Sequence, residues 1–188
     1  MIDKDLVIKN NINLLDYINF LNSLDVPIAQ YRNKAKKGNI KSDLELIKSH
    51  FKGILILNDY IEFVDFADGL HLGQEDLAKI DCNKQRAIAT VREQIGSKIL
   101  GLSTHNAVEI EVANTLALDY IGLGAYRATS TKKEAQVAGE QLIELAKNAT
   151  HKVALIGGVR LEDDFSNYPH IGYQVIGSDL IKKFKESM

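Results

Sequence analysis

Ile54-Leu55-Ile56-Leu57-Asn58-Asp59 is the most informative stretch for the architecture of this chain. Its first four residues are apolar at both odd and even positions, so a strand over 54–57 would be buried on both faces. Strands of that kind occur in parallel sheets covered by helices, whereas half-exposed strands alternate apolar and polar residues. The run then ends in an amide and a carboxylate, which places polar chemistry at the carboxyl end of a buried strand.

Similar short apolar runs recur along the chain, separated by segments of helical periodicity. We expect strands at 6–8, 28–31, 54–57, 70–72, 99–102, 120–123, 153–156 and 173–176. Helical spacing is present at 14–24, 43–51, 108–118 and about 141–147. This alternation predicts an α/β fold, a compact (β/α)8 TIM barrel, with an open doubly wound sheet as the alternative. The connections 60–67 and 160–169 are too short for long helices, so some outer helices should be shortened.

Composition narrows the class of protein. With 188 residues, of which 45% are hydrophobic, we expect a single TIM-barrel domain over residues 1–188. The formal net charge is −2, so no overall field attracts nucleic acid or an anionic membrane, and neither is expected as a partner. The single cysteine, Cys82, rules out an internal disulfide and favours a reduced, cytoplasmic setting. No apolar run approaches the length of a membrane span.

Two aspartates follow apolar runs that are close in the sequence. Asp59 comes directly after the run 54–57, and Asp76 ends the segment 68–76 that contains the next expected strand. If these strands are neighbours in a parallel sheet, both carboxylates project from the same rim and can share one divalent cation. Mg²⁺ uses one or two carboxylates and fills its other positions with water and phosphate oxygens, so the pair indicates a phosphorylated substrate. The alternative is that Asp59 caps a helix and Asp76 closes a turn.

Cationic and hydroxyl side chains follow two other strands. Gln30, Arg32 and Lys34 alternate, so they would point the same way and offer an amide and two cations, unless this segment is a solvated basic loop. After the sixth strand, hydroxyl residues 129–131 precede Lys132, a pattern that suits an anion clamp or an ordinary flexible connector.

Glycines and polar residues end the remaining strands. Gly157-Gly158 and Gly177-Ser178 follow the last two strands, where such barrels often bind phosphate through backbone N–H groups. The fifth strand ends in Ser103-Thr104-His105. Either hydroxyl residue can cap the next helix, and His105 is either an acid–base group or a packed or solvent-facing histidine. We expect His71, flanked by leucines, to hold its strand end through a hydrogen bond.

In this order, the motifs resemble the thiamine phosphate synthase (thiamine-phosphate pyrophosphorylase) and thiazole tautomerase superfamily over about residues 30–178. The matching pieces are Gln30-x-Arg32-x-Lys34, Asn58-Asp59, the segment 67–76, Gly101-x-Ser103, Asp119-Tyr120-Ile121-Gly122-x-Gly124, Thr129-x-Thr131-Lys132-Lys133 and Ile156-Gly157-Gly158. The resemblance implies a (β/α)8 barrel that joins hydroxymethylpyrimidine diphosphate to a thiazole phosphate. It also implies Mg²⁺ as cofactor and release of pyrophosphate in thiamine biosynthesis.

The resemblance also implies roles for individual residues. Asp59 and Asp76 would hold the metal, and Gln30 and Ser103 would face the pyrimidine. Those that would bind the diphosphate are Arg32, Lys34, Asn58 and Lys132. Those that would lie at the thiazole phosphate are Thr129, Thr131, Gly158, Gly177 and Ser178. Catalysis would depend on Arg32, Lys34, Lys132 and Ser103, because leaving-group stabilisation and positioning matter more here than acid–base chemistry.

Two other functions remain open on sequence grounds. One is a thiazole tautomerase-like isomerase, which would use His105 as a proton shuttle without Mg²⁺. The other is a non-catalytic paralogue that binds a phosphorylated metabolite. The sixth loop has Tyr126-Arg127-Ala128 where the family tends to have an aromatic residue and a proline. This departure affects the end of the site that would bind the thiazole phosphate more than the metal end. The sequence does not fix the oligomeric state, and a homo-oligomer is among the states that it allows.

Overall fold

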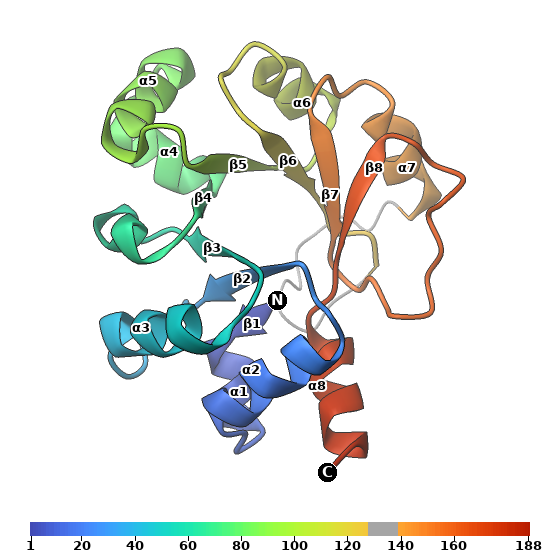
Figure 1. Cartoon of the computed structure of the whole chain (residues 1–188). Helices are drawn as coiled ribbons and strands as arrows, with labels where there is room; N and C mark the ends of the chain where they lie inside the picture. The colour runs from blue at the N-terminus through green and yellow to red at the C-terminus, as the bar shows by residue number, and fades with distance from the viewer. Residues whose placement is uncertain (128–138) are drawn as a thin grey trace.

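The structure, a computed structural model, describes residues 1–127 and 139–188. Its strands form one parallel sheet in the sequential order β1 to β8. The strands are β1 (Ile2–Asp3), β2 (Ile28–Arg32), β3 (Ile54–Asn58), β4 (Gly69–Leu72), β5 (Ile99–Thr104), β6 (Tyr120–Leu123), β7 (Lys152–Ile156) and β8 (Ile171–Val175). Figure 1 shows this sheet curling around a central axis with helices on its outside.

The helices connect successive strands, as a parallel sheet requires. They are α1 (Lys4–Lys9), α2 (Leu14–Ser23), α3 (Ile40–His50), α4 (Gln74–Ile80), α5 (Lys84–Ile95), α6 (Ala107–Ala113), α7 (Glu140–Ala146) and α8 (Ser178–Glu186). The connection from β3 to β4 holds only the 3-10 helix η1 (Ile61–Phe66), and 160–169 contains no helix. The expected shortening of these two connections is therefore confirmed.

The sheet is a TIM-like curled sheet. Its sequential order differs from that of a doubly wound sheet, in which the strand order reverses, so that alternative is wrong. Among the described residues the strand pairs run from β1 to β8, and none joins β8 to β1. These two edges approach each other at the chain start, where the Met1 amino group donates to the Ile176 carbonyl oxygen at 2.8 Å.

The strand expected at 6–8 is wrong, because Lys4–Lys9 forms helix α1 and the first strand is the shorter Ile2–Asp3. The Asp3 side chain begins the helix by accepting a hydrogen bond from the Leu6 N–H at 3.1 Å. A three-residue apolar run is too short to show whether its period is that of a strand or of a helix. The other expected strands all overlap observed ones.

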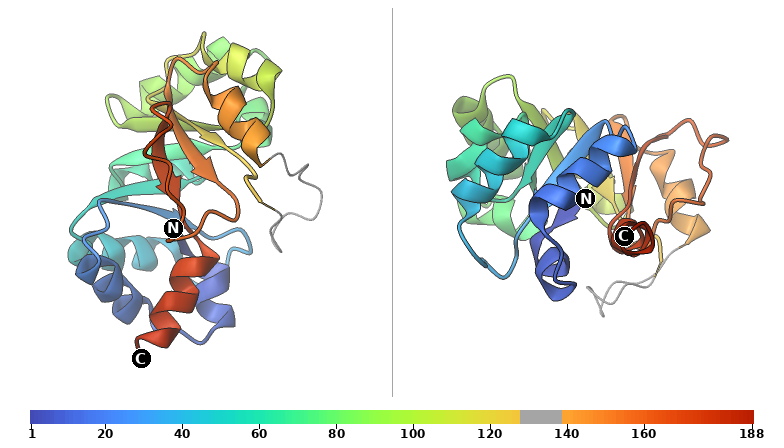
Figure 2. Two further views of the ribbon diagram at one scale, coloured as in Figure 1. Left: turned by 90° about the vertical axis from the view of Figure 1, so that its right-hand side faces the viewer. Right: turned by 60° about the horizontal axis from the view of Figure 1, so that its bottom comes forward.

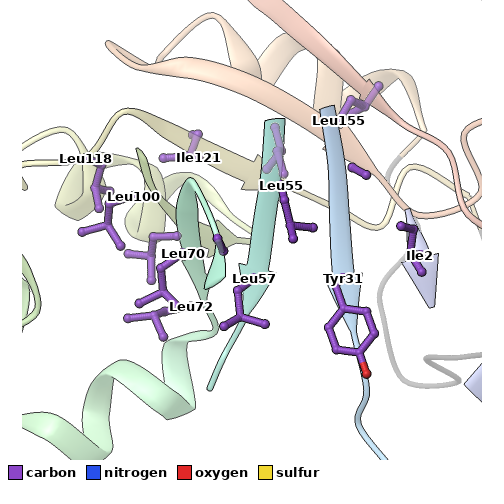
Figure 3. Packing of buried hydrophobic residues seen from close by; sticks show 14 of the residues in the cluster. Ile2, Tyr31, Leu55, Leu57, Leu70, Leu72, Leu100, Leu118, Ile121 and Leu155 are labelled. Carbon is purple, nitrogen blue, oxygen red and sulfur yellow. The ribbon is translucent and has the colours of Figure 1, made fainter. Parts of the chain in front are cut away.

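The hydrophobic core lies mainly between the sheet and the surrounding helices. Figure 3 shows Leu55, Leu57, Leu70, Leu100 and Ile121 among its members, and each is at most 3% exposed. Because strand side chains alternate between the two faces, the intervening positions point toward the interior of the curl.

The central residues of strand β3 are buried on both faces, as its apolar pattern predicts, whereas Ile54 at its start is 38% exposed. Leu55 and Leu57 pack outward, and the alternate residue Ile56 is only 3% exposed.

The C-terminal helix α8 packs against the N-terminal helices, as both views of Figure 2 show. The rings of Tyr17 in α2 and Phe184 in α8 meet edge to face with centroids 5.5 Å apart. Within the described ranges, no helix has both the length and the apolar character needed to cross a membrane.

Candidate active site

Asp59 and Asp76 lie together at the carboxyl ends of β3 and β4. Asp59 directly follows β3, and its N–H donates to the His71 carbonyl oxygen at 2.9 Å, which ties the two strand ends together. Asp76 lies in the first turn of α4, where the helix dipole favours a carboxylate. The two carboxyl groups are close enough for Asp76 to raise the pKa of Asp59. The structure thus places on one rim the two residues that the sequence analysis assigned to a metal.

The electrostatics of this pair favour a bound cation or proton. Burial is the largest cause that raises the pKa of Asp59 to about 6, followed by the charge of Asp76 and the hydrogen bond to it. Asp59 also has a positive φ of 66°, a strained conformation for a non-glycine residue, and Asn58 Nδ2 donates to its Oδ2 at 2.6 Å. Two adjacent carboxylates in a partly buried site suit Mg²⁺ completed by water and phosphate oxygens. No group of three or more candidate metal ligands occurs in the parts of the chain that the structure describes.

Arg32 and Lys34 are close enough to Asp59 for their charges to lower its pKa. Their effect is smaller than that of burial and of Asp76, which raise the pKa. The Arg32 Nη1 donates to Asp3 Oδ2 at 2.5 Å, and the Asp3 side chain is only 3% exposed. Asp3 therefore fixes the guanidinium beside the carboxylate pair, and Lys34 adds a second, exposed cation.

A third cation reaches the carboxylate pair from α4. Lys79 Nζ lies 2.7 Å from Asp76 Oδ1, one helical turn further along. Its side chain is 73% exposed, so the ion pair is weak and can be exchanged for another cation.

The side chains of His71 and Tyr120 lie between Gln30 and Ser103 in the interior of the curled sheet. His71 on β4 contacts the Ser103 hydroxyl through Nε2 and the Tyr120 hydroxyl through Nδ1, each at 2.9 Å. Gln30 on β2 lies near enough to the Tyr120 hydroxyl to lower the pKa of Tyr120 through a hydrogen bond, against the larger effect of burial. The prediction that His71 holds its strand end through a hydrogen bond is confirmed.

The loops after β6 and β7 are joined at the opposite side of the rim. Gly157 and Gly158 have positive φ angles of 89° and 71°, which only glycine adopts easily. Arg127 forms a two-pronged ion pair with Asp163, in which Nη2 donates to Oδ1 at 2.7 Å, and its Nη1 also donates to the Gly158 carbonyl oxygen at 2.9 Å. Gly177 precedes α8, whose first residue is Ser178, so the N–H groups of that helix start near the end of β8.

Part of the predicted anion clamp lies outside the described residues. Thr129, Thr131 and Lys132 fall within 128–138, so their places in the site stay predictions.

The helix after β5 is capped differently from the expectation. Asn106, and neither Ser103 nor Thr104, caps α6 by accepting from the Glu109 N–H at 2.9 Å. Thr104 is buried instead and donates to the Gly122 carbonyl oxygen. His105 lies at this strand end with Nδ1 2.9 Å from Glu109 Oε2.

Four residues of the site were missed from the sequence, namely Asp3, Lys79, Tyr120 and Asp163. Lys79 could have been found, since residues three apart on a helix are neighbours. Tyr120 carried a weaker signal, a polar aromatic residue at the start of an otherwise apolar run. Asp3 and Asp163 lie 29 and 36 residues from their arginine partners, and no local pattern links them.

These features define an α/β protein with a TIM-like parallel sheet and a polar site at the carboxyl ends of its strands. The family model described as "Thiamine monophosphate synthase" matches residues 5–164. The chain therefore belongs to the thiamine monophosphate synthase family.

Curated relatives and a solved structure agree with this placement. The chain is 36% identical over 146 residues to "Thiamine-phosphate synthase" of Pelotomaculum thermopropionicum, covering 72% of this chain and 62% of that protein. It is 38% identical over 144 residues to the enzyme of the same name from Methanosarcina mazei, covering 72% and 56%. These matches span less than two thirds of the relatives' own length. Thiamine phosphate pyrophosphorylase from Pyrococcus furiosus superposes with a TM-score of 0.60 at 18% identity over 93% of this chain and 88% of that one, which supports the fold.

Proposed function

We propose that this chain is a Mg²⁺-dependent transferase that joins hydroxymethylpyrimidine diphosphate to a thiazole phosphate and releases pyrophosphate, a step of thiamine biosynthesis. The observation that carries the proposal is the contact between Asp59 and Asp76 beside Arg32 and Lys34. This combination suits a metal-bound diphosphate, because it provides both oxygen ligands for the ion and cations for the phosphate oxygens. Family membership and the names of the relatives support the same reaction.

Asp59 and Asp76 would hold the Mg²⁺. When bound, the ion supplies neutralisation of the negative charge on the diphosphate. Arg32, Lys34 and the Asn58 amide would bind the remaining diphosphate oxygens, with Lys132 completing the set from the segment outside the described residues.

In the reaction, the C–O bond between the pyrimidine methylene and the diphosphate breaks, and its electron pair leaves on the diphosphate. The thiazole nitrogen then uses its lone pair to form the new C–N bond to that methylene. Arg32 and Lys34 stabilise the departing anion, while Gln30 and Ser103 hold the pyrimidine ring in place. Removing one such cation is expected to cost about 3 kcal/mol, or about a hundredfold in rate.

The second phosphate would lie on the other side of the rim. Gly158, Gly177 and Ser178 would offer backbone N–H groups to it, and Thr129 and Thr131 would add hydroxyls. The positive φ values at Gly157 and Gly158 and the start of α8 after β8 support this assignment.

The side-chain charges are consistent with a diphosphate ester. Asp3, Asp59 and Asp76 are balanced by Arg32, Lys34 and Lys79. If a divalent cation replaces Lys79 and Lys132 joins the site, the net charge would be roughly +2, which offsets most of the charge of roughly −3 on a diphosphate ester.

The test is pyrophosphate release from both substrates, with Mg²⁺ and with excess chelator. We expect activity only with Mg²⁺, and loss of activity in Asp59→Ala and Asp76→Asn with native circular dichroism. Glu75→Gln is the matched control, because Glu75 is the exposed carboxylate next to Asp76 in the same helical turn and should keep its activity. Full activity in chelator would contradict the proposal.

The same assay separates the two other candidate functions. A strong loss in His105→Ala, with little effect of Asp76→Asn or of chelator, would point to an isomerase. Binding of both substrates without pyrophosphate release, in the presence of Mg²⁺, would point to a non-catalytic protein that binds phosphorylated metabolites.

A further inference from the structure

Gln30 and Ser103, the two groups proposed to face the pyrimidine, are linked in a chain through the side chains of Tyr120 and His71. Tyr120 Oη lies 2.9 Å from His71 Nδ1, and His71 Nε2 lies 2.9 Å from Ser103 Oγ. Gln30 lies near enough to the Tyr120 hydroxyl to lower the pKa of Tyr120 through a hydrogen bond, against the larger effect of burial. The members come from β2, β6, β4 and β5, so the chain crosses the interior of the curled sheet. The rings of His71 and Tyr120 are also stacked, with centroids 5.5 Å apart.

Two glycines leave the space that these rings occupy. A Cβ atom at Gly101 would lie 2.2 Å from Tyr120 Cζ, and one at Gly122 would lie 2.9 Å from His71 Cε1. Any larger residue at Gly101 would push the Tyr120 ring away from His71. The motif Gly101-x-Ser103 thus contains the hydrogen-bond partner of His71 and the space for the Tyr120 ring. The motif Tyr120-Ile121-Gly122 contains Tyr120 and the space for the His71 ring. The proposed function alone does not explain this arrangement.

His71 is neutral in this environment. Its residue is 7% exposed, and burial lowers its pKa to about 4. A neutral imidazole has one N–H donor and one acceptor nitrogen, so its two hydrogen bonds must run in opposite senses.

The two tautomers therefore orient the whole chain in two opposite ways. With the proton on Nδ1, His71 donates to Tyr120, which donates to the Gln30 carbonyl, so the Gln30 NH₂ remains as a donor toward the ligand. Ser103 then donates to Nε2 and remains an acceptor. With the proton on Nε2, every bond reverses, so Gln30 presents its carbonyl and Ser103 its hydroxyl proton.

We propose that His71 and Tyr120 are positioning residues that make Gln30 and Ser103 present one donor and one acceptor to the pyrimidine, never two of the same kind. An aminopyrimidine edge has this complementary form, because its exocyclic amine donates and the adjacent ring nitrogen accepts. This inference rests on the proposed function and deepens it by naming what selects the base. The chain rejects a ring that carries two acceptors, since one of its own acceptors would then face another acceptor.

The first experiment compares binding of the 4-amino pyrimidine diphosphate and its 4-methoxy analogue, which has two acceptors. Binding is measured by calorimetry with Mg²⁺ and without thiazole phosphate. The parent protein should prefer the amine by at least about tenfold, and Tyr120→Phe should reduce this preference to about twofold, because Gln30 is then able to rotate. Steric cost of the methyl group is common to both proteins and cancels from the comparison.

Tyr173→Phe is the matched control. Tyr173 on β8 contacts Tyr120 edge to face with centroids 6.3 Å apart, and its hydroxyl is not a member of the chain. It should keep the full preference, and both variants should bind inorganic pyrophosphate with Mg²⁺ as the parent protein does. An unchanged preference in Tyr120→Phe, or an equal loss in Tyr173→Phe, would overturn the inference.

A second measurement needs no variant. The ¹⁵N chemical shifts of the His71 ring report which nitrogen carries the proton, and they can be recorded with the 4-amino ligand and with its 4-oxo analogue, whose donor and acceptor are exchanged. We expect opposite tautomers in the two complexes. The same tautomer in both would show that His71 has only a structural role.

Failure of the inference is distinguishable from failure of the proposed function. If the parent protein binds neither pyrimidine diphosphate and releases no pyrophosphate, the function itself is wrong. If it turns over both substrates while Tyr120→Phe keeps the same base preference, only the role of the hydrogen-bonded chain is wrong.

Discussion

Replacing Asp59 by asparagine is expected to stabilise the metal-free protein while removing its activity. The raised pKa of Asp59 means that its ionised form is less favourable in the folded state than in the unfolded state. Asparagine has nearly the same shape, tolerates the positive φ at this position and can still accept the hydrogen bond from Asn58. The substitution therefore removes the charge with little other change.

The size of the effect follows from the pKa. A change from 3.8 to about 6 corresponds to about 3 kcal/mol if the site is fully shielded from water. Because Asp59 remains partly exposed, solvent screening reduces this, and we expect about 1–2 kcal/mol. A carboxyl group with a raised folded-state pKa loses its stabilising contribution as the pH rises from about 4 to above 6. The variant should thus match the parent protein only below about pH 4, gain on it progressively above that pH, and exceed it most at pH 7.5.

The assay is urea unfolding in chelator at pH 4.5, 6 and 7.5, followed by circular dichroism. Adding Mg²⁺ at about ten times its Kd should then stabilise the parent protein by about 1.4 kcal/mol and leave Asp59→Asn unchanged. Glu75→Gln should show neither the pH-dependent gain nor the loss of the Mg²⁺ effect. The reasoning is refuted if Asp59→Asn is less stable than the parent protein at pH 7.5 in chelator, or if its advantage is as large at pH 4.5 as at pH 7.5.

Three further predictions concern the interior and the opposite rim. Burial lowers the pKa of His71 to about 4, so its contribution to stability should decline by up to about 3 kcal/mol between pH 6.5 and pH 4, seen as a shrinking difference from His71→Gln in urea unfolding. Gly101→Ala should cost about 1–3 kcal/mol in the same assay, because its Cβ would overlap the Tyr120 ring, and no loss would show that the ring moves without cost. Arg127→Ala should raise the KM for the thiazole phosphate about tenfold and leave that for the pyrimidine diphosphate unchanged, since the pair with Asp163 holds the loops after β6 and β7. Equal changes in both KM values would contradict this placement.

The parts of the fold that sequence could predict are those with a local or consecutive pattern. Strand β3 is recognisable because four successive apolar residues report burial on both faces. The approach of Asp59 and Asp76 is predictable because β3 and β4 are consecutive parallel strands whose carboxyl ends share a rim. Neither conclusion required knowledge of distant parts of the chain.

The parts that sequence could not predict depend on contacts between distant residues or on very short runs. The apolar run 6–8 fits a strand or a helix equally well, and the Asp3 cap decides in favour of the helix. The same Asp3 side chain binds Arg32, a contact that exists only because β1 and β2 pair in the observed register. His71 and Tyr120 are 49 residues apart, so the sequence indicated a hydrogen bond for His71 without its partner.

In the structure, the ligand-binding groups that the sequence identifies are already held by other protein groups. Arg32 is bonded to Asp3 through Nη1, so its Nη2 and Nε donors can still reach a phosphate while the partner stays in place. Asp76 differs, because the exposed Lys79 occupies one of its oxygens and would have to be exchanged for the proposed metal. Side chains fixed before binding lose little conformational entropy when the ligand arrives, and their dipoles need little reorganisation during reaction. Under the proposed function, the buried Asp3–Arg32 pair would support catalysis without being broken, whereas the exposed Asp76–Lys79 pair would tune metal affinity.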